Sequence, residues 1–259
     1  MNIQTKDSVV TIAATGLLAY ASADIAHHVL GHGGACLVLG GEVISLSSTY
    51  VKCSLTGSAI DLAGPFANLV VGQVAMLAAR MAKRVSPPMR LFFVLASAFN
   101  LLWFALQLAF SAATRTDDWA WALHQYHVTD LFRYGLIIFG ALAYVLTVRV
   151  SAAQMTPFAY PRSRSWSIML TAWLTAGTIA CATAAFDHSA SAAPFRLVLE
   201  QSLGLSVGLV FVPARAARMA SPDIVQEGAL AFSIPWTVAA AVVAAGSILL
   251  LGPGIAIAN

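Results

Sequence analysis

Long apolar segments separated by short polar ones dominate the chain. A helix that crosses a bilayer needs roughly 17–25 apolar residues, and the sequence contains seven runs of this kind. The runs are Ser8–Leu30, Ser58–Met81, Met89–Ala113, Leu131–Val150, Trp166–Phe186, Phe195–Val212 and Phe232–Leu251. Because a backbone in lipid must satisfy its own hydrogen bonds, each run is expected to be helical. The pattern predicts an all-α polytopic transmembrane helical bundle of about 6–7 spans, in a single integral membrane domain over residues 1–259.

The segment after the first apolar run has a different pattern. Residues 42–53, EVISLSSTYVKC, alternate apolar and polar side chains, which is typical of a strand or hairpin. We therefore expect a short hairpin or re-entrant loop there. Cys36 lies before this segment, and Cys53 is its last residue. They could form a disulfide or simply pack as small side chains, since the sequence does not give the distance between them.

Composition supports a membrane protein and gives its orientation. The chain is 59% hydrophobic and 10% charged, whereas soluble domains carry about 25% charged residues. With seven spans, all Lys and Arg except Lys52, Arg115, Arg133 and Arg196 fall on the N-terminal side. The positive-inside rule then predicts a cytoplasmic N-terminus. The expected location is the lipid bilayer of a bacterial inner (plasma) membrane. No basic cluster with interleaved aromatics and no P-loop or dinucleotide fingerprint is present, so neither nucleic acid nor nucleotide is an expected partner.

The histidines collect on the opposite side of the predicted membrane, and three of them lie in the first span. Asp24, His28 and His32 are spaced i, i+4, i+8, so they share one face of an α-helix. Ionisable residues within a membrane usually face the bundle interior and mark a functional site. Two imidazoles at i and i+4 can bind one metal ion. We therefore predict a metal at His28 and His32, with Asp24 orienting one imidazole from behind.

The other histidines lie near later spans. His124, His127 and Asp130 recur every three residues before the fourth span, and His188 follows the fifth. On a helix the first three would share a face. They could form a second metal site or a gate, or they could be a solvated cap before the fourth span.

Two motifs in the first part of the chain resemble a known family. The run HVLGHGGACLVLGGEV resembles the zinc-motif helix of the site-2 protease family of intramembrane metalloproteases, typically His-Glu-x-Gly-His followed by small residues and a glycine pair. The run DLAGPFANLVVG resembles that family's Ala-Gly-Pro-x-x-Asn segment. The two motifs agree in order and spacing across roughly the first 75 residues. The matching positions are His28, Gly31, His32, Gly33, Ala35, Gly40 and Gly41 in the first motif and Gly64, Pro65 and Asn68 in the second.

This resemblance implies a Zn²⁺ centre whose third ligand is an Asp from a later helix. The commonest family form of that segment, Asn-x-x-Pro ending in Asp-Gly, is missing here. The run FNLLWFALQLAFSAATRTDDW resembles a divergent branch in which Asn100 begins the helix and an Asp-Trp pair ends it. On that comparison Asp118 joins His28 and His32 as a metal ligand, and Asp117 is the reserve. The metalloprotease-like core would span about residues 8–131, with additional helices over about 132–259.

One departure from the family concerns catalysis. Where the family has a glutamate between the two histidines, this sequence has Val29. In the family that carboxylate is the general base for the zinc-bound water. Valine cannot accept a proton, and general acid–base catalysis contributes about 10²–10⁴-fold. His27 or Asp24 could replace the glutamate as catalytic residues, and so could His124 or His127 from the later loop.

Several functions remain open at this point. The resemblance implies a divergent intramembrane zinc metalloprotease-like protein that hydrolyses or binds membrane protein segments. With Val29 in the motif, the sequence leaves open whether the chain is an enzyme. The alternatives are a non-catalytic accessory or structural subunit (a pseudoprotease), a membrane metal-dependent oxidase, or a transporter. The oxidase reading requires more histidines than the six that the chain has.

Overall fold

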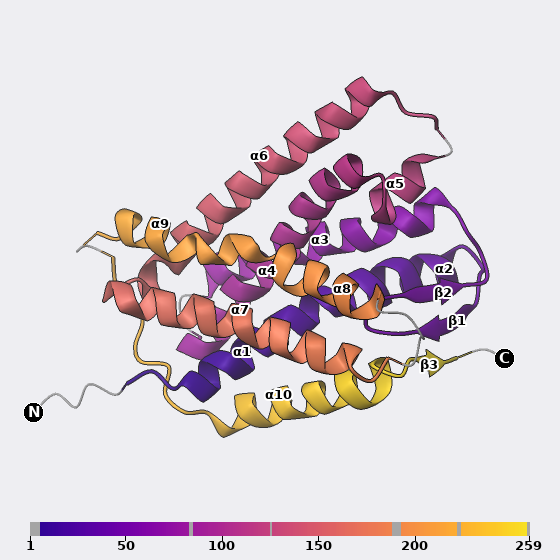
Figure 1. The fold of residues 1–259 in the computed structure, drawn as a ribbon. Helices are drawn as coiled ribbons and strands as arrows, with labels where there is room; N and C mark the ends of the chain where they lie inside the picture. Colours follow the sequence, from indigo (N-terminus) through magenta and orange to yellow (C-terminus); the bar gives the residue numbers. More distant parts are fainter. Residues whose placement is uncertain (1–5, 83–84, 125, 188–192, 222–223, 258–259) are drawn as a thin grey trace, which may run out of the picture.

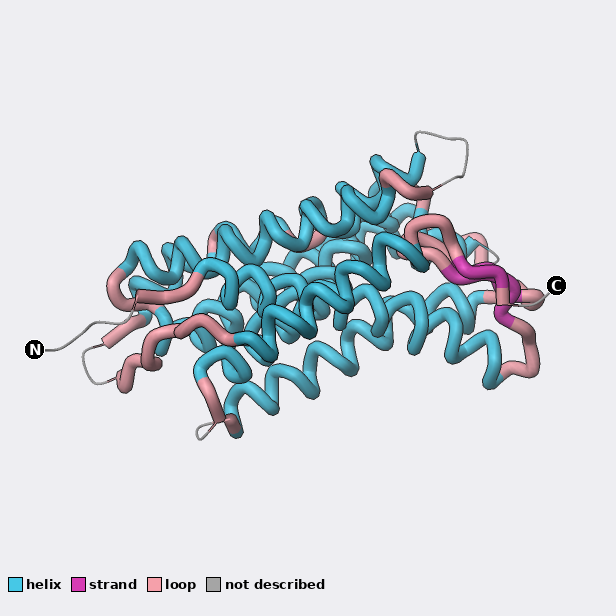
Figure 2. Tube along the Cα trace, turned by 90° about the horizontal axis from the view of Figure 1, so that it is seen from below, coloured by secondary structure: helices cyan, strands magenta, loops and turns pink. Residues whose placement is uncertain are grey.

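The computed structural model describes the chain except residues 1–5, 83–84, 125, 188–192, 222–223 and 258–259. Seven of its helices are long and apolar enough to cross a membrane, which confirms the expected all-α bundle and is compatible with an integral membrane protein. The helices run lengthwise, with the start of α1 at one end of the bundle and a small sheet at the other (Figures 1 and 2). The spans are Val9–Val38, Ser58–Met81, Pro87–Thr114, Asp130–Phe158, Arg162–Ala184, Arg196–Met219 and Ile234–Leu251.

Some spans are single helices and others are composite. The first span combines α1 (Val9–Ile25), η1 (Ala26–Gly33) and α2 (Gly34–Val38). The next two spans are the single helices α3 (Ser58–Met81) and α4 (Pro87–Thr114). The fourth span is α6 (Asp130–Met155) with the 3₁₀ turn η2 (Thr156–Phe158), and the fifth is α7 (Arg162–Ala184). The short helix α5 (Asp117–His124) lies between α4 and α6. The predicted run Phe195–Val212 is an interrupted helix made of α8 (Ala193–Leu199), η3 (Glu200–Gly204), η4 (Val207–Val210) and α9 (Val212–Met219). The last span is α10 (Ile234–Gly246) with η5 (Ser247–Leu251).

The start of several helices follows from local sequence. Ser8 caps α1, its hydroxyl accepting a hydrogen bond from the Thr11 amide at 3.3 Å. Thr129 caps α6 in the same way, accepting from the Phe132 amide. Such side chains satisfy amides that have no partner in the first helical turn. Pro87 opens α4, at a position where a missing amide hydrogen costs nothing.

Helix α4 is the centre of the bundle. It contacts α1, α3 and α6. In the most apolar stretch of α4, 83% of the residues are buried, against 6% in that of the last span, Ile234–Leu251. Phe99 and Trp103 are among the largest fully buried side chains. The residues on α4 are therefore held on all sides by protein, while most of α10 faces the surroundings.

The expected hairpin is present and has a third strand. β1 (Val43–Leu46) and β2 (Val51–Cys53) pair antiparallel, with a bulge between Val43 and Ser45. The two-residue strand β3 (Ile255–Ala256) pairs antiparallel with the other edge of β1, so the order in the sheet is β2-β1-β3. The sequence pattern did not indicate β3, because two residues are too few to show alternation.

A disulfide ties the hairpin to the first span. Cys36 in α2 is bonded to Cys53 at the end of β2, with the Cα atoms 5.9 Å apart, and Cys181 is free. Of the two alternatives left by the sequence, the structure therefore has the bridge. It fastens the sheet to the helical segment that carries the three histidines of the first span.

Removing this bridge should lower stability. The two cysteines are 17 residues apart, and closing a loop of roughly 15 residues stabilises a fold by about 3 kcal/mol in the chain-entropy model. We expect the double variant Cys36→Ser/Cys53→Ser to have a lower Tm in detergent, measured by thermal unfolding. Cys181→Ser, which breaks no bridge, is the matched control and should unfold near the parent Tm. Equal Tm values for all three proteins would contradict a stabilising role.

Candidate metal centre

The first span changes its hydrogen-bonding period where the histidines occur. Ala26–Gly33 form a π-helix, in which the backbone bonds run from i to i+5. Residues five apart therefore come to lie on one face, in place of residues four apart. The rings of His27 and His32 have their centroids 4.8 Å apart, whereas those of His28 and His32 are 6.2 Å apart. The structure thus pairs His32 with His27, while the sequence pattern predicted His28.

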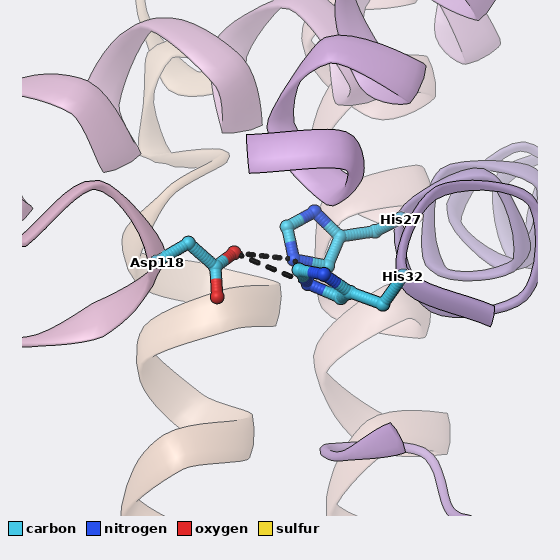
Figure 3. A group of neighbouring side chains, drawn as sticks. All are labelled: His27, His32 and Asp118. Atoms are coloured by element: carbon cyan, nitrogen blue, oxygen red, sulfur yellow. Dashed lines mark hydrogen bonds and ion pairs between the residues drawn. The ribbon is translucent and has the colours of Figure 1, made fainter. Parts of the chain in front are cut away.

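His27 and His32 meet Asp118 from α5 (Figure 3). Nε2 of His27 lies 2.9 Å from Oδ2 of Asp118, and Nε2 of His32 lies 3.3 Å from the same oxygen. The two Nε2 atoms are 3.1 Å apart. Among the described residues, this is the group of three side chains whose potential ligand atoms lie close enough to share one metal ion.

Each imidazole is held by a hydrogen bond at its other nitrogen. Nδ1 of His27 lies 2.7 Å from the side-chain oxygen of Asn68, and Nδ1 of His32 lies 2.7 Å from the backbone oxygen of Ile60. The amide nitrogen of Asn68 donates to the carbonyl of Ala23 and to the side-chain oxygen of Asn100, both at 2.9 Å. Outer partners of this kind orient metal-binding histidines in proteins.

These outer bonds determine where the ring protons lie. The carbonyl of Ile60 can only accept, so Nδ1 of His32 carries the proton. Because the Asn68 nitrogen already donates to two acceptors, its oxygen faces His27, and Nδ1 of that ring also carries the proton. Both neutral rings therefore direct an Nε2 lone pair toward the Asp118 carboxylate. Three acceptors this close repel one another unless a cation or extra protons lie between them.

The spacing of the three ligand atoms fits a zinc ion. Ligands about 2.0–2.1 Å from a tetrahedral zinc are separated from one another by about 3.3 Å. The separations in the cluster are 2.9, 3.1 and 3.3 Å. Two imidazoles and one carboxylate are also ligand types that zinc uses, and three protein ligands are usual in catalytic sites. The residues present can therefore hold this ion.

Asp118 is positioned by the end of α4 and the start of α5. Arg115 and Asp117 have positive φ angles, 61° and 73°, which turn the chain sharply between the two helices. The buried amide of Gln107 donates to Oδ2 of Asp118 at 2.9 Å. Burial alone would raise the pKa of Asp118. When no cation is bound and His27 and His32 are protonated, their Nε2 atoms donate to this carboxylate and hold its pKa well below its usual range. Asp118 is therefore a carboxylate at neutral pH.

Asp117 differs from its neighbour in the direction of its pKa shift. Burial and the adjacent Asp118 carboxylate raise the pKa of Asp117 to about 6, against the stabilising bonds from the Asp118 amide and Gln107. It is not part of the cluster of three. Asp117, the reserve ligand implied by the resemblance, is therefore next to the cluster but does not belong to it.

Close contact between η1 and α3 leaves room for the ligands. A Cβ atom at Gly31 would lie 2.5 Å from the Cα atom of Gly64. A Cβ atom at Gly64 would lie 2.4 Å from Nε2 of His32 and 2.9 Å from Nε2 of His27. Glycine at both positions is therefore required by space. Gly64, Pro65 and Asn68 are all buried on this stretch of α3.

The cluster opens into a cavity of about 980 Å³ at the sheet end of the bundle. His27, His28, His32, Asp117 and Asp118 all line it. Residues of all three strands line it as well, together with Asp61 from the start of α3. A molecule of the size of several amino-acid residues can therefore reach the cluster from this end.

His28 and Asp24 form a separate pair beside the cluster. Nδ1 of His28 lies 3.1 Å from Oδ1 of Asp24, as the i, i+4 spacing indicated. The His28 ring is T-shaped to that of His27, with centroids 4.9 Å apart. His28 is 3% exposed and lines the cavity, whereas Val29 is 39% exposed and is not among the described residues that line it.

The later histidines are not brought to the cluster. His124 ends α5, and His127 lies in the turn that follows with a φ of 46°. Neither is among the described residues that line the cavity. Asp130, their partner in the sequence pattern, pairs instead with Arg115 at 3.0 Å. His188 lies outside the described residues.

Three contacts of the centre carry no clear signal in the sequence. Gln107 lies in an apolar helix and reaches Asp118 from eleven residues away. Trp103 stacks on the His27 ring at 5.0 Å, with 21° between the planes. The Ile60 bond uses a backbone atom, which no residue type reveals. Of the three, only Gln107 could have been noticed in the sequence, as a polar residue within the apolar run Met89–Ala113.

Comparison with known proteins adds no assignment. The chain shows no match to the protein-family models, to the curated proteins or to the solved structures with which it was compared.

Proposed function

We propose that this chain is an intramembrane zinc-dependent hydrolase that resembles the site-2 protease family and acts on membrane protein segments. His27, His32 and Asp118 would hold the metal. The observation that carries the proposal is the convergence of two Nε2 lone pairs and a carboxylate oxygen, with both Nδ1 atoms already bonded. A set of acceptors held this close by outer partners favours a bound cation.

Zinc at this cluster would lower the pKa of a bound water and polarise a carbonyl. Proton transfer must then come from the chain itself. If His27 is the first ligand, the residue that follows it is His28, not Val29. His28 therefore takes the place in the motif that glutamate has in the family, and the extra residue before His32 is absorbed by the π-helix.

His28 is also suited to the role by its contacts. Its Nδ1 bonds Asp24, which leaves Nε2 for the cavity. We propose that this nitrogen accepts the proton that water loses when it adds to a peptide carbonyl, and returns it to the leaving amine. Asp24 would hold the ring in that orientation and stabilise the imidazolium.

The proposed location is the inner membrane of a bacterium, with the N-terminus in the cytoplasm. The Cys36–Cys53 disulfide supports this orientation, because such bonds persist outside the reducing cytoplasm. It lies at the sheet end, where the Lys and Arg distribution predicts the outer face. The cavity and the metal cluster would then be reached from outside the cytoplasm.

A second candidate is a non-catalytic accessory subunit that binds metal or a membrane segment. The absence of a carboxylate between His27 and His32 favours it, since a histidine, His28, stands where the family has glutamate. In this case the cluster would stabilise the protein without hydrolysis.

Hydrolysis of an apolar membrane-segment peptide in detergent separates the two candidates. We expect the zinc-loaded parent to cleave the peptide and a chelator to stop cleavage. His28→Gln should keep its metal but lose roughly 10²–10⁴ in rate, the usual contribution of a general base. Val29→Leu, next to it but outside the cavity lining, is the matched control and should keep the parent rate. A zinc-loaded parent without activity would favour the accessory subunit, and an active His28→Gln would assign proton transfer elsewhere.

A further inference from the structure

The C-terminal strand occupies an edge of the sheet and lines the cavity. β3 pairs with β1 through Ser45 opposite Ala256 and Leu46 opposite Ile255. The amide of Ile257 donates to the carbonyl of Ile44 at 2.9 Å. In Figures 1 and 2, β3 lies with the hairpin at the end of the bundle, after the last helix of the chain.

β3 and the turn before it share the cavity with the metal cluster. Gly252, Pro253, Gly254, Ile255 and Ala256 line the same cavity as the three ligands. The strand they pair with, β1, lines it through Ser45 and Leu46. Both the cluster and the edge of β1 are therefore partly enclosed by the chain's own C-terminal segment.

β3 is held less firmly than the residue that precedes it in the turn, Gly252. Gly252 is packed tightly, since a Cβ there would lie 2.8 Å from the Thr183 oxygen and 2.5 Å from that of Ile248. Beyond it, Gly254 has a φ of 81°, and Ile257 is 57% exposed. Only two residues are paired in β3. A short strand with exposed backbone bonds opens at low cost, so residues after the Gly252 anchor can leave β1 without disturbing the helices.

We infer that β3 is a displaceable occupant of the β1 edge, which covers part of the cavity until an extended polypeptide takes its place. When β3 leaves, β1 presents an unpaired row of amides and carbonyls, to which another strand can add. The identity of that strand, a protein substrate, rests on the function proposed above. The opening of β3 does not, because it follows from the sheet alone.

Opening can be measured without metal or activity. Asp61→Cys, in a Cys181→Ala background, places a thiol in the cavity lining, and its rate of reaction with a water-soluble maleimide reports access. Ile257→Pro removes the amide that donates to Ile44. Ala256→Pro is the matched control, because alternation in an antiparallel pair turns the Ala256 amide away from β1.

We expect Ile257→Pro to accelerate labelling about tenfold and removal of residues 255–259 to accelerate it at least as much. Ala256→Pro should stay within about twofold of the parent. Equal labelling rates in all four proteins would overturn the inference, even if the parent hydrolyses peptides. Faster labelling in a protein that neither binds zinc nor cleaves peptides would support the inference while removing the proposed function. Thermal unfolding of each variant verifies that the helices remain folded.

Discussion

Replacing His27 with alanine is expected to abolish metal binding, whereas replacing His28 should leave it nearly intact. His27 contributes Nε2 to the cluster with His32 and Asp118, while Nδ1 of His28 is bonded to Asp24. Loss of an outer partner typically costs about 10–100-fold in metal affinity. Loss of a ligand should therefore cost more than about 100-fold. The measurement is zinc content per chain in detergent, followed by zinc affinity in competition with a chelating dye.

Further variants make this result specific. His32→Ala and Asp118→Ala should lose the metal as His27→Ala does, and Asp117→Ala should keep it. His124→Ala, at the end of α5 and away from the cavity, is the matched histidine control. Loss of zinc in His28→Ala with retention in His27→Ala would mean that His28, and not His27, is the ligand that binds zinc with His32. Absence of zinc from the parent as well, after purification without chelators, would remove the metal centre altogether.

Gly64→Ala is expected to remove the metal although it replaces no ligand. The added methyl group would lie 2.4 Å from Nε2 of His32 and 2.9 Å from that of His27, where the metal would have to bind. The backbone cannot move away, since Gly31 is already packed against Gly64. We expect zinc affinity to fall more than about 100-fold, together with a loss of stability of about 1–3 kcal/mol from overpacking. Zinc titration and thermal unfolding measure the two effects.

Gly72→Ala on the same helix separates overpacking from the effect on the metal. A Cβ at Gly72 would lie 2.7 Å from the side chain of Leu101, so this substitution also crowds a helix contact. This Cβ would touch no ligand, although it would lie 3.1 Å from Cβ of Asn100, whose side chain bonds Asn68. Gly72→Ala should therefore lower the Tm and change zinc affinity by no more than about tenfold. If Gly64→Ala binds zinc as tightly as Gly72→Ala does, then the ion does not lie between the two imidazoles.

The spans and the hairpin could be predicted because each depends on a local pattern. Seven apolar runs give seven helices, and the predicted and observed bounds differ mainly where a helix continues past its apolar core, as Val9–Val38 does. Alternation in residues 42–53 gives β1 and β2. The i, i+4 spacing also gives the bond between Asp24 and His28. In these cases the period of the side chains along the sequence is sufficient.

Two of the three residues of the cluster could be predicted from the sequence. His32 and Asp118 occupy the expected place, but His27 takes the position expected for His28. The difference arises because the backbone bonds of η1 run from i to i+5, whereas helical spacing rules assume the i to i+4 bonds of an α-helix. The bonds from Asn68 and Ile60 involve α3, which lies about one span further along the chain. The π-helix and these partners belong to the packing of η1 against α3.

The sequence by itself determined which segments are helical, where a hairpin forms, and that ionisable residues collect at one end of the bundle. Hydropathy and alternation act within about 20 residues, so these features need no tertiary information. Only the tertiary structure decided which histidine joins Asp118, that Cys36 bonds Cys53, and that β3 pairs with β1. Each of these depends on contacts between segments that are distant in sequence or on the hydrogen-bonding register of one turn. These contacts depend on how whole helices pack against one another, which a local sequence pattern does not show.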